Sequence, residues 1–476
     1  MKHFSLISLN VATSKLSMVV MICVWLIGIG GGGGFSLLFS ANSIQRGINF
    51  ADESNKSDRC LLIVGYGRVG QECAKWAKGR FNSIHGTVRS KAKPGNRQLG
   101  NTSNEEDMVE TIDFGVDNLR SYFQQHEPTH VLITLQPLRD SSQSTHPRGP
   151  LQVDRSELDT SMSSSFQEQQ TVFDLLREMI PHHAWIGLLS TTGVYGNHDG
   201  AWVTEDSSLL CSDGSNAALY RDYEYDWKQW IERATATTTT TASSNEISLI
   251  SNATSSTYPL QRQLCIFRCS GIYDSSRSAL HTVYKNGLSL ERMPDSCNET
   301  GSSHKSRDIT NRIHATDIAL AVVSSMLQHE NRPAYWKESY LYRIYNLADD
   351  LPESRKVVLA YAATLLKSIG IPVATKIANI GSKSRRKCKK QEPRSGTASY
   401  SASPGRRDRR RLEERKLISN QRMKQELSLD PSRKQEQGKS GQDARCLLYP
   451  TYREGLAAIL LDPSTPWHQD LLNTKE

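Results

Sequence analysis

Residues 61–70 read Leu61-Leu62-Ile63-Val64-Gly65-Tyr66-Gly67-Arg68-Val69-Gly70, and this stretch decides which fold the sequence predicts. Its four apolar residues are typical of a buried strand, and a helix-like stretch follows from 71 to 78. Between them stands G-x-G-x-x-G. The first glycine permits a tight turn, the second lets a pyrophosphate approach the backbone, and the third lets helix and strand pack closely, with the helix N-terminus facing the phosphates. We therefore expect all six residues 65–70 to contact a dinucleotide, with a plain glycine turn as the alternative.

The end of the second predicted strand indicates which dinucleotide is bound. An acidic residue about twenty positions after the glycines accepts a hydrogen bond from the ribose of NAD. Here the strand-like run 82–88 is followed by Arg89, Ser90, Lys91 and Lys93, with no Asp or Glu among them. Such groups suit a 2′-phosphate, so Arg89 and Ser90 are expected cofactor contacts and NADP is preferred, with NAD possible. A solvated basic loop is the alternative.

The remaining chain alternates strand-like and helix-like stretches, as a doubly wound parallel sheet does. The strand-like runs are 129–135, 184–189 and 264–268, and the helix-like runs are 118–126, 165–180 and 220–231. Ligands of open α/β sheets lie at the carboxyl ends of the strands. The loops 190–196 and 270–273 are therefore expected to face a cofactor or substrate. The sequence predicts an α/β fold of the Rossmann type with a smaller C-terminal part on the substrate side.

The composition indicates that part of the 476-residue chain is not packed, because its hydrophobic fraction is 37%. Residues 234–257, which include the threonine run 237–241, and residues 381–445 are predicted to be disordered insertions. The second insertion carries a net charge of +12, whereas the whole chain carries +8. Its basic clusters lack interleaved aromatic residues, so no nucleic-acid binding is expected.

The nine cysteines form no C-x-x-C pair and no other metal-ligand spacing. An odd number of cysteines without such a pattern favours reduced thiols, and no metal site is expected.

The N-terminus predicts a targeting segment. An apolar run over residues 16–29 has the length of a signal-peptide core and is short for a membrane span. A hydroxyl-rich, acid-free stretch over residues 35–43 follows it. This order resembles the two-part plastid-targeting leaders of algae with secondary plastids, so a plastid location is expected. A secretory signal leading to the endoplasmic reticulum and an uncleaved anchor are the alternatives, and membrane contact is expected only through this segment.

Six motifs beyond the glycine-rich turn, in the same order along the chain, resemble those of the extended short-chain dehydrogenases/reductases. More narrowly, they are similar to the atypical branch of the NAD-dependent epimerase/dehydratase family. The resemblance covers residues 59–461, interrupted by the two insertions. One departure is Asp274, which stands where the family motif R-x-x-G-I-Y-G has its last glycine. The motifs are S-T-T-G-V-Y-G at 190–196, R-C-S-G-I-Y at 268–273, R-I-H-A-T-D-I-A at 312–319, Y-N-L-A-D-D-L-P at 345–352, L-I-S-N at 417–420 and Y-P-T-Y-R-E-G-L at 449–456.

The resemblance implies a catalytic Tyr-x-x-x-Lys pair and a hydroxyl residue at the end of the preceding strand. Thr191 matches the hydroxyl position and Tyr220 matches the tyrosine that exchanges the substrate proton. The residue four positions after Tyr220 is Glu224 instead of lysine, and a carboxylate there should raise the pKa of the phenol. Tyr223 and Lys228 stand one residue too far apart for a helical i, i+4 pair, although both can point to the same side of the helix. An ordinary helix face is the alternative for Tyr220 and Glu224.

The function that the resemblance implies is an NADP-dependent oxidoreductase acting on a small molecule. A sugar-nucleotide epimerase or dehydratase and a non-catalytic NADP-binding module are the alternatives, and the absent lysine counts against the former. The expected domains are a targeting segment and linker (1–57), a Rossmann domain (58–273), a C-terminal part (274–461) and a tail (462–476). The substrate and the oligomeric state are not determined by the sequence.

Overall fold

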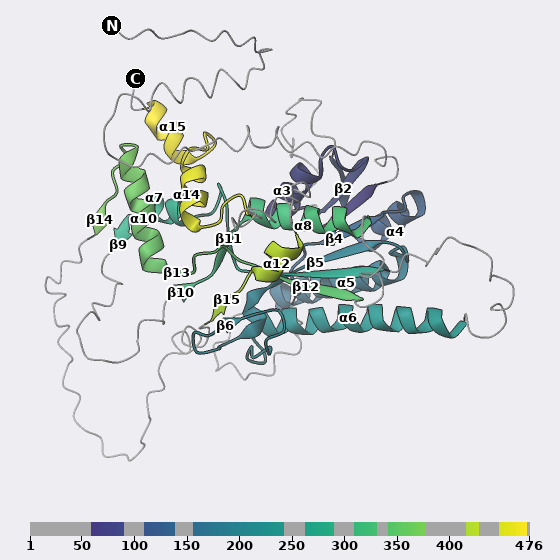
Figure 1. The fold of residues 1–476 in the computed structure, drawn as a ribbon. Coiled ribbons are helices and arrows are strands. Elements are labelled where there is room, and N and C mark those ends of the chain that lie inside the picture. Colours follow the sequence, from purple (N-terminus) through teal and green to yellow (C-terminus); the bar gives the residue numbers. More distant parts are fainter. Residues whose placement is uncertain are drawn as a thin grey trace, which may run out of the picture. The chain divides into compact units, whose positions relative to one another are not determined.

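A seven-stranded parallel sheet organises the computed structural model, which describes residues 59–89, 109–138, 156–241, 262–289, 309–330, 341–376, 416–427 and 447–473. Every strand of this sheet pairs with its neighbours in parallel, as expected for a Rossmann-type α/β fold (Figure 1). Strands β4, β5 and β7 are buried along almost their whole length because helices cover both faces of the sheet. The strand order is β12 (Tyr342–Leu347), β7 (Gln263–Cys269), β5 (Trp185–Thr191), β4 (His130–Ile133), β1 (Cys60–Val64), β2 (Ser83–Val88) and β3 (Val109–Asp113).

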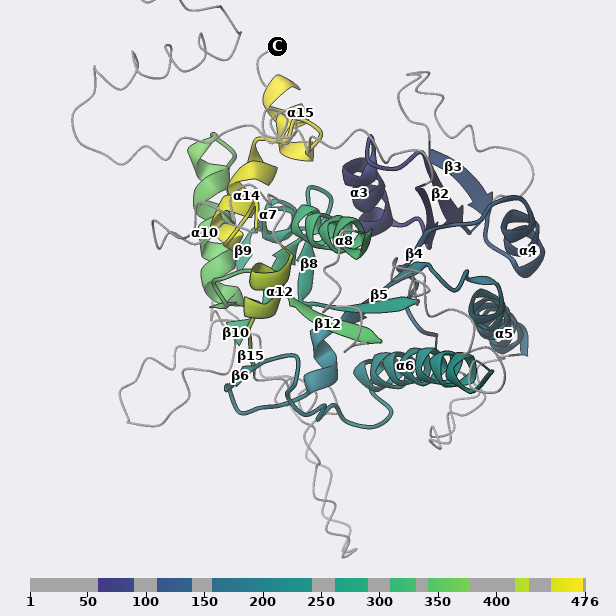
Figure 2. The same cartoon turned by 45° about the vertical axis from the view of Figure 1, so that its right-hand side comes forward.

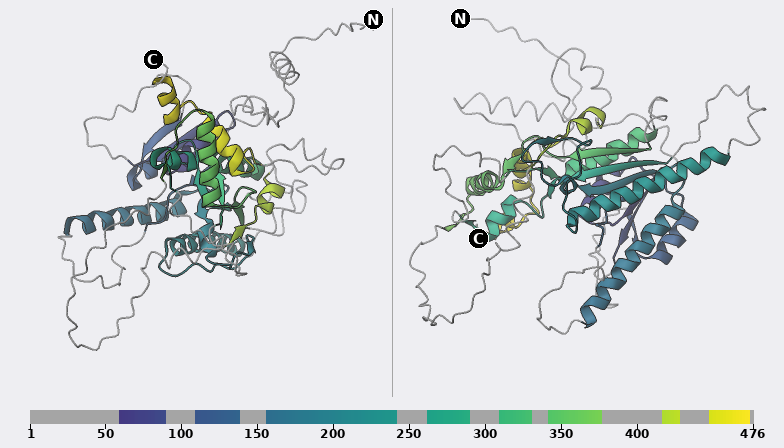
Figure 3. Two further views of the ribbon diagram at one scale, coloured as in Figure 1. Left: turned by 90° about the vertical axis from the view of Figure 1, so that its left-hand side faces the viewer. Right: turned by 90° about the horizontal axis from the view of Figure 1, so that it is seen from below.

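The two faces of the sheet are covered by different helices (Figures 2 and 3). Helices α3 (Arg68–Ala77) and α8 (Ala315–Glu330) pack together on one face. Helices α4 (Val116–Gln125), α5 (Ser156–Met179) and α6 (Asn216–Thr241) cover the other. The alternation of β1 explains this division, since Leu62 and Val64 join the core beneath α4, α5 and α6 while Leu61 and Ile63 are buried on the opposite face.

The C-terminal part has its own hydrophobic core. It is formed by α7 (Ala279–Asn286), α10 (Arg355–Ser368), α14 (Tyr452–Leu460) and the buried Trp467 of α15 (Pro466–Asn473). Within the described residues, four short strand pairs form separate two-stranded sheets beside the main sheet. They are β8 (Gly271–Tyr273) with β11 (Arg312–His314), β9 (Leu288–Ser289) with β14 (Thr375–Lys376), β10 (Ile309–Thr310) with β13 (Glu353–Ser354), and β6 (Trp202–Val203) with β15 (Leu417–Ile418).

Elements from beyond the expected boundary at residue 273 also contribute to the main sheet and its covering helices. Helix α8 packs on α3 and strand β12 pairs with β7, so both elements belong to the main sheet and its covering helices. The expected tail contains α15, whose Trp467 is buried and donates its indole N–H to the Leu460 carbonyl at 3.1 Å.

The two expected insertions are ordered in part, which corrects the prediction. Residues 234–241 continue helix α6, although threonine is a weak helix former. Residues 416–427 form β15 and α12 (Gln421–Glu426), with Ile418 and Met423 buried. Buried apolar side chains offset the cost of ordering this short segment within its basic surroundings. The remainder of both insertions lies outside the described residues, as do residues 1–57. None of the helices in the described ranges is long and apolar enough to cross a membrane.

Candidate functional site

The turn between β1 and α3 has the geometry that a phosphate-binding loop requires. Gly65 has a φ of +97°, a conformation that side-chain-bearing residues rarely adopt. Its N–H donates to Thr87 Oγ1 at 2.8 Å, and its carbonyl accepts from the Thr134 hydroxyl. A Cβ on Gly65 would come within 2.8 Å of Thr134 and of Leu135. Only glycine fits this position.

The other two glycines of the turn have opposite surroundings. A Cβ on Gly70 would lie 3.0 Å from Ile63 Cγ2 and 3.1 Å from the Gly65 carbonyl, so helix and strand are in close contact there. A Cβ on Gly67 would meet no heavy atom within 4 Å. This open space lies before the first turn of α3, where helix geometry leaves the N–H groups of Arg68, Val69 and Gly70 without an intrahelical acceptor. Backbone donors and open space together fit a pyrophosphate.

Tyr66 fixes the turn to β2. Its N–H donates to the Thr87 carbonyl at 2.7 Å, and its ring lies so close to β2 that a Cβ on Gly86 would be 2.6 Å from it. The carboxyl end of β2 therefore lies beside the glycine-rich turn, where the ribose of a dinucleotide would be recognised.

Arg89 follows β2 directly and is exposed at this edge. Its guanidinium lies 5.2 Å from the centroid of the Phe114 ring, and this contact holds the cation beside the end of the strand. Val88 ends β2, so the last residue of this strand is not the acid that NAD-binding sites carry there. Ser90 lies outside the described residues.

Thr191 and Tyr220 lie in neighbouring elements at the carboxyl edge. Thr191 ends β5 and caps the 3-10 helix η2 (Thr192–Tyr195), its Oγ1 accepting from the Gly193 N–H at 3.1 Å. A Cβ on Gly193 would be 3.3 Å from Ala217, which stands one helical turn before Tyr220 on α6. No hydrogen bond joins the two hydroxyls within the described part of the chain.

Burial is the main influence on the pKa of Tyr220. Its ring packs against the cluster that Val194, Tyr195 and Ile418 help to form. Burial, with a smaller contribution from Cys269, raises the pKa of the phenol to about 12. Tyr220 therefore stays protonated near neutral pH and can donate a proton.

Glu224 does not act on Tyr220 in the expected way. Its buried carboxylate accepts from Ser190 Oγ at 2.6 Å and from Arg268 Nη2 at 2.7 Å. The pKa of Tyr220 is raised, as expected, but the causes are burial and Cys269. The Glu224 carboxylate forms an ion pair with Arg268 instead.

Arg268 organises a buried network that the sequence analysis missed. Its Nη1 donates to Tyr195 Oη at 2.9 Å, and that hydroxyl donates to Asn346 Oδ1 at 2.7 Å. The network joins β5, β7 and β12 where their carboxyl ends meet. A signal was present in the sequence, since an arginine within the buried strand Q-L-C-I-F-R-C requires an acidic partner.

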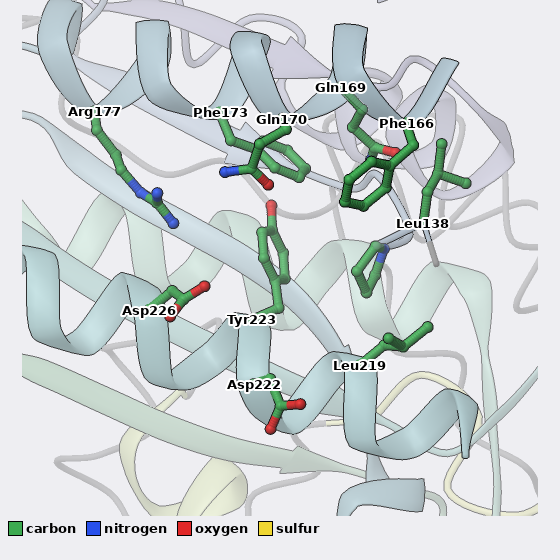
Figure 4. Close-up of a pocket in the computed structure, with 11 residues that line it drawn as sticks. Leu138, Phe166, Gln169, Gln170, Phe173, Arg177, Leu219, Asp222, Tyr223 and Asp226 are labelled. Atoms are coloured by element: carbon green, nitrogen blue, oxygen red, sulfur yellow. The ribbon is translucent and has the colours of Figure 1, made fainter. Parts of the chain in front are cut away.

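Tyr223 and Lys228 point to different surroundings. Tyr223 faces α5 and lines a cavity of about 130 Å³ between α5 and α6, together with Phe166, Phe173 and Arg177 (Figure 4). Lys228 Nζ lies 3.9 Å from Glu224 Oε2 and 5.1 Å from the centroid of the Tyr342 ring. The two residues therefore do not replace the Tyr-x-x-x-Lys pair.

A second group of titratable side chains lies where β8, β11 and β12 end. Asp349 follows β12 and is buried, and burial raises its pKa to about 8 although the charge of Arg312 lowers it. Burial also raises the pKa of Asp317, on α8, to about 7, against hydrogen bonds from the Leu448 and Tyr449 N–H groups. Both carboxyls thus titrate close to neutral pH.

No family model matches this sequence, and no curated protein matches it significantly. Solved structures similar to it across most of the chain, at low sequence identity, include a protein of unknown function and two nucleotide-sugar epimerases. A functionally unknown conserved protein from Silicibacter pomeroyi is 21% identical, with 85% of this chain and 99% of that chain covered and a TM-score of 0.44. The UDP-glucose-4-epimerase from Stenotrophomonas maltophila, solved with bound NAD and formylated UDP-arabinopyranose, is 12% identical, with 87% and 99% covered and a TM-score of 0.47. The UDP-N-acetylglucosamine 4-epimerase from Methanobrevibacter ruminantium is 12% identical, with 85% and 97% covered and a TM-score of 0.45. Similarity at this level carries no argument about cofactor or substrate.

Proposed function

We propose that the protein binds a nicotinamide dinucleotide at the turn between β1 and α3 and is an oxidoreductase acting on a small molecule. The observation that carries this proposal is the combination of Gly65, Gly67 and Gly70 within one turn. The first has a positive φ, the second leaves open space at the helix N-terminus, and the third is in close contact with β1. Plain glycine turns do not require all three features together.

NADP(H) is the proposed cofactor. Arg89 presents an exposed guanidinium at the carboxyl end of β2, where NAD-binding sites place an acid. A guanidinium forms strong, charge-assisted hydrogen bonds with a phosphate. The 2′-phosphate of NADP would therefore find a partner there, whereas the ribose hydroxyl of NAD would find no carboxylate.

The side chains at the carboxyl edge fit proton donation to a substrate oxygen. The bound dinucleotide would supply the hydride. Tyr220 is protonated near neutral pH, with a pKa of about 12, and would donate its proton to the substrate oxygen; the Thr191 hydroxyl would orient the same oxygen. A protonated phenol suits reduction of a carbonyl better than oxidation of an alcohol, which needs a proton acceptor.

A second candidate is a dinucleotide-binding protein without turnover. The buried Glu224–Arg268 ion pair favours it, because it occupies the helix position from which a lysine would lower the pKa of Tyr220. The same observation counts against a sugar-nucleotide epimerase or dehydratase.

Calorimetric titration of the full chain with NADPH and NADH tests the proposal. We expect binding of both, with NADPH tighter, and loss of binding in Gly67→Val. The valine side chain would enter open space, so the fold should stay intact, but it would block the approach of the pyrophosphate to the backbone. Gly115→Val, at the corresponding position before α4, is the matched control and should bind as the unmodified chain does. Absence of NADPH and NADH binding in the unmodified chain would refute the function.

A substrate screen that follows NADPH absorbance then separates the two candidates. Turnover that is lost in Tyr220→Phe supports the oxidoreductase. Tight binding without turnover across carbonyl substrates supports the binding protein.

A further inference from the structure

An ion pair connects the glycine-rich turn to a segment more than two hundred residues away. Arg68 Nη1 lies 3.1 Å from Asp274 Oδ2 and donates to Asp274 Oδ1 at 3.2 Å and to Ser276 Oγ at 2.7 Å. Arg68 is the first residue of α3, directly after Gly67. Its guanidinium is therefore tethered beside the helix N-terminus that would receive the phosphates.

Asp274 is held rigidly and as a carboxylate. Its Oδ1 accepts from the Ser276 N–H at 2.8 Å, from the Ser276 hydroxyl at 2.6 Å and from the Arg277 N–H at 2.8 Å. Burial raises its pKa, but the hydrogen bonds from Ser276 and the charge of Arg68 outweigh this effect and hold the pKa below its usual value. The Asp274 side chain is 14% exposed, whereas that of Arg68 is 49% exposed.

Asp274 lies on the segment that leads from β8 into the C-terminal part. Asp274 lies between β8 and α7, two elements labelled in Figure 2. Strand β8 pairs with β11, and Leu280 and Val283 of α7 lie in the C-terminal core. The ion pair thus joins the glycine-rich turn to the segment that leads into that core.

We propose that Arg68 and Asp274 form a charge clasp, and that the phosphates of the bound dinucleotide compete with Asp274 for Arg68. This inference rests on the proposed function. Asp274 now supplies the anion beside the helix N-terminus, and a pyrophosphate on the N–H groups of residues 68–70 brings further negative charge to the same place. Arg68 Nη1 is bound by Asp274 and Ser276, so a phosphate that takes this donor must displace Asp274. Binding therefore opens the clasp, and Asp274 lowers the affinity for the dinucleotide.

A double-mutant cycle of NADPH titrations on the full chain tests the clasp. Asp274→Asn keeps the side-chain oxygen that accepts the hydrogen bonds of the turn and removes the negative charge. The variant should bind NADPH roughly fivefold more tightly, because the free energy of a partly exposed ion pair corresponds to a change in affinity of this size. Arg68→Gln should bind more weakly than the unmodified chain. In the Arg68→Gln background, the Asp274→Asn change should have little further effect, because no arginine is left to compete for.

Asp213→Asn is the matched control, because it breaks an exposed ion pair of 3.1 Å with Arg221 at the start of α6. It should leave NADPH affinity unchanged. Melting temperatures without nucleotide should agree among the variants, which would show that the affinities compare folded proteins.

Three results would overturn the clasp. Equal or weaker binding by Asp274→Asn would show that the carboxylate does not compete. An equal gain in both backgrounds would show that it acts without Arg68. Absence of NADPH and NADH binding in the unmodified chain would remove the proposed function together with the clasp, whereas the first two results leave that function standing.

Discussion

Glu224 Oε2 lies 2.7 Å from Arg268 Nη2, and the two side chains are 1% and 2% exposed. Glu224 stands four residues after Tyr220 on α6, and Arg268 stands near the end of β7. At this position of α6, Glu224 therefore binds the helix to the sheet through Arg268 of β7. A lysine there would face the guanidinium of Arg268, so the usual way of lowering the pKa of a catalytic tyrosine is not available to this chain.

Removal of one partner of this pair should destabilise the fold strongly. Glu224→Gln leaves the Arg268 charge buried without its carboxylate, and the free energy of unfolding should fall by about 3–5 kcal/mol. Urea denaturation measures this change. Asp226→Asn, at an exposed position on the same helix, is the control and should stay within about 0.5 kcal/mol. A loss in Glu224→Gln no larger than in the control would show that the pair contributes no stability.

Arg89 should determine the preference for NADPH over NADH. Arg89→Ala removes a charge-assisted hydrogen bond to the 2′-phosphate, so NADPH affinity should fall by on the order of 1–3 kcal/mol while NADH affinity stays the same. Calorimetry with both nucleotides measures the difference. Arg355→Ala removes an exposed arginine from the start of α10 and should affect neither. An equal loss for both nucleotides in Arg89→Ala would mean that Arg89 does not contact the 2′-phosphate.

Any redox turnover should depend on the Tyr220 hydroxyl. Tyr220→Phe keeps the packing of the ring and removes the proton donor, so the rate should fall about 10²-fold or more without loss of NADPH binding. Tyr225→Phe changes a tyrosine of the same helix that is 61% exposed and should keep full activity. Full activity in Tyr220→Phe would make Tyr220 a structural residue.

Buried carboxyls should make the fold less stable as the pH rises from about 6.5 to about 8. Asp349 and Asp317 have folded pKa values of about 8 and about 7, above the usual carboxyl value. The folded state then binds more protons than the unfolded state, so stability falls with rising pH, by up to about 1.4 kcal/mol per pH unit for each group. Burial lowers the pKa of His314 to about 4. This histidine makes stability rise with pH, but only below about pH 6.5, the pKa of a histidine in the unfolded chain.

Asp349→Asn isolates this contribution. Urea denaturation at pH values between about 6.5 and 8 should give a flatter dependence in the variant, because one of the two titrating carboxyls is gone. Asp462→Asn, on the loop before α15, serves as the control. Identical slopes in Asp349→Asn and the unmodified chain would show that Asp349 is ionised throughout this range.

The sequence alone determined the Rossmann strand–turn–helix and the parallel sheet. Glycine spacing and continuous apolar runs are local signals, and the turn at Gly65 and the burial of β1 follow from them directly. Arg89 was placed at the end of β2 for the same reason. The low apolar content of residues 381–445 predicted disorder, but it could not show that Ile418 and Met423 find a core contributed by other segments.

Only the tertiary structure decided which charges meet. From the sequence, the partner expected for Glu224 is Tyr220, its neighbour along the helix. The fold instead brings Arg268 to Glu224 from β7. In the sequence Asp274 is only a departure from a motif, and its pairing with Arg68 joins two residues 206 positions apart. Side-chain pairing across a sheet edge is fixed by where the strands end together in space, and no local periodicity in the sequence records that.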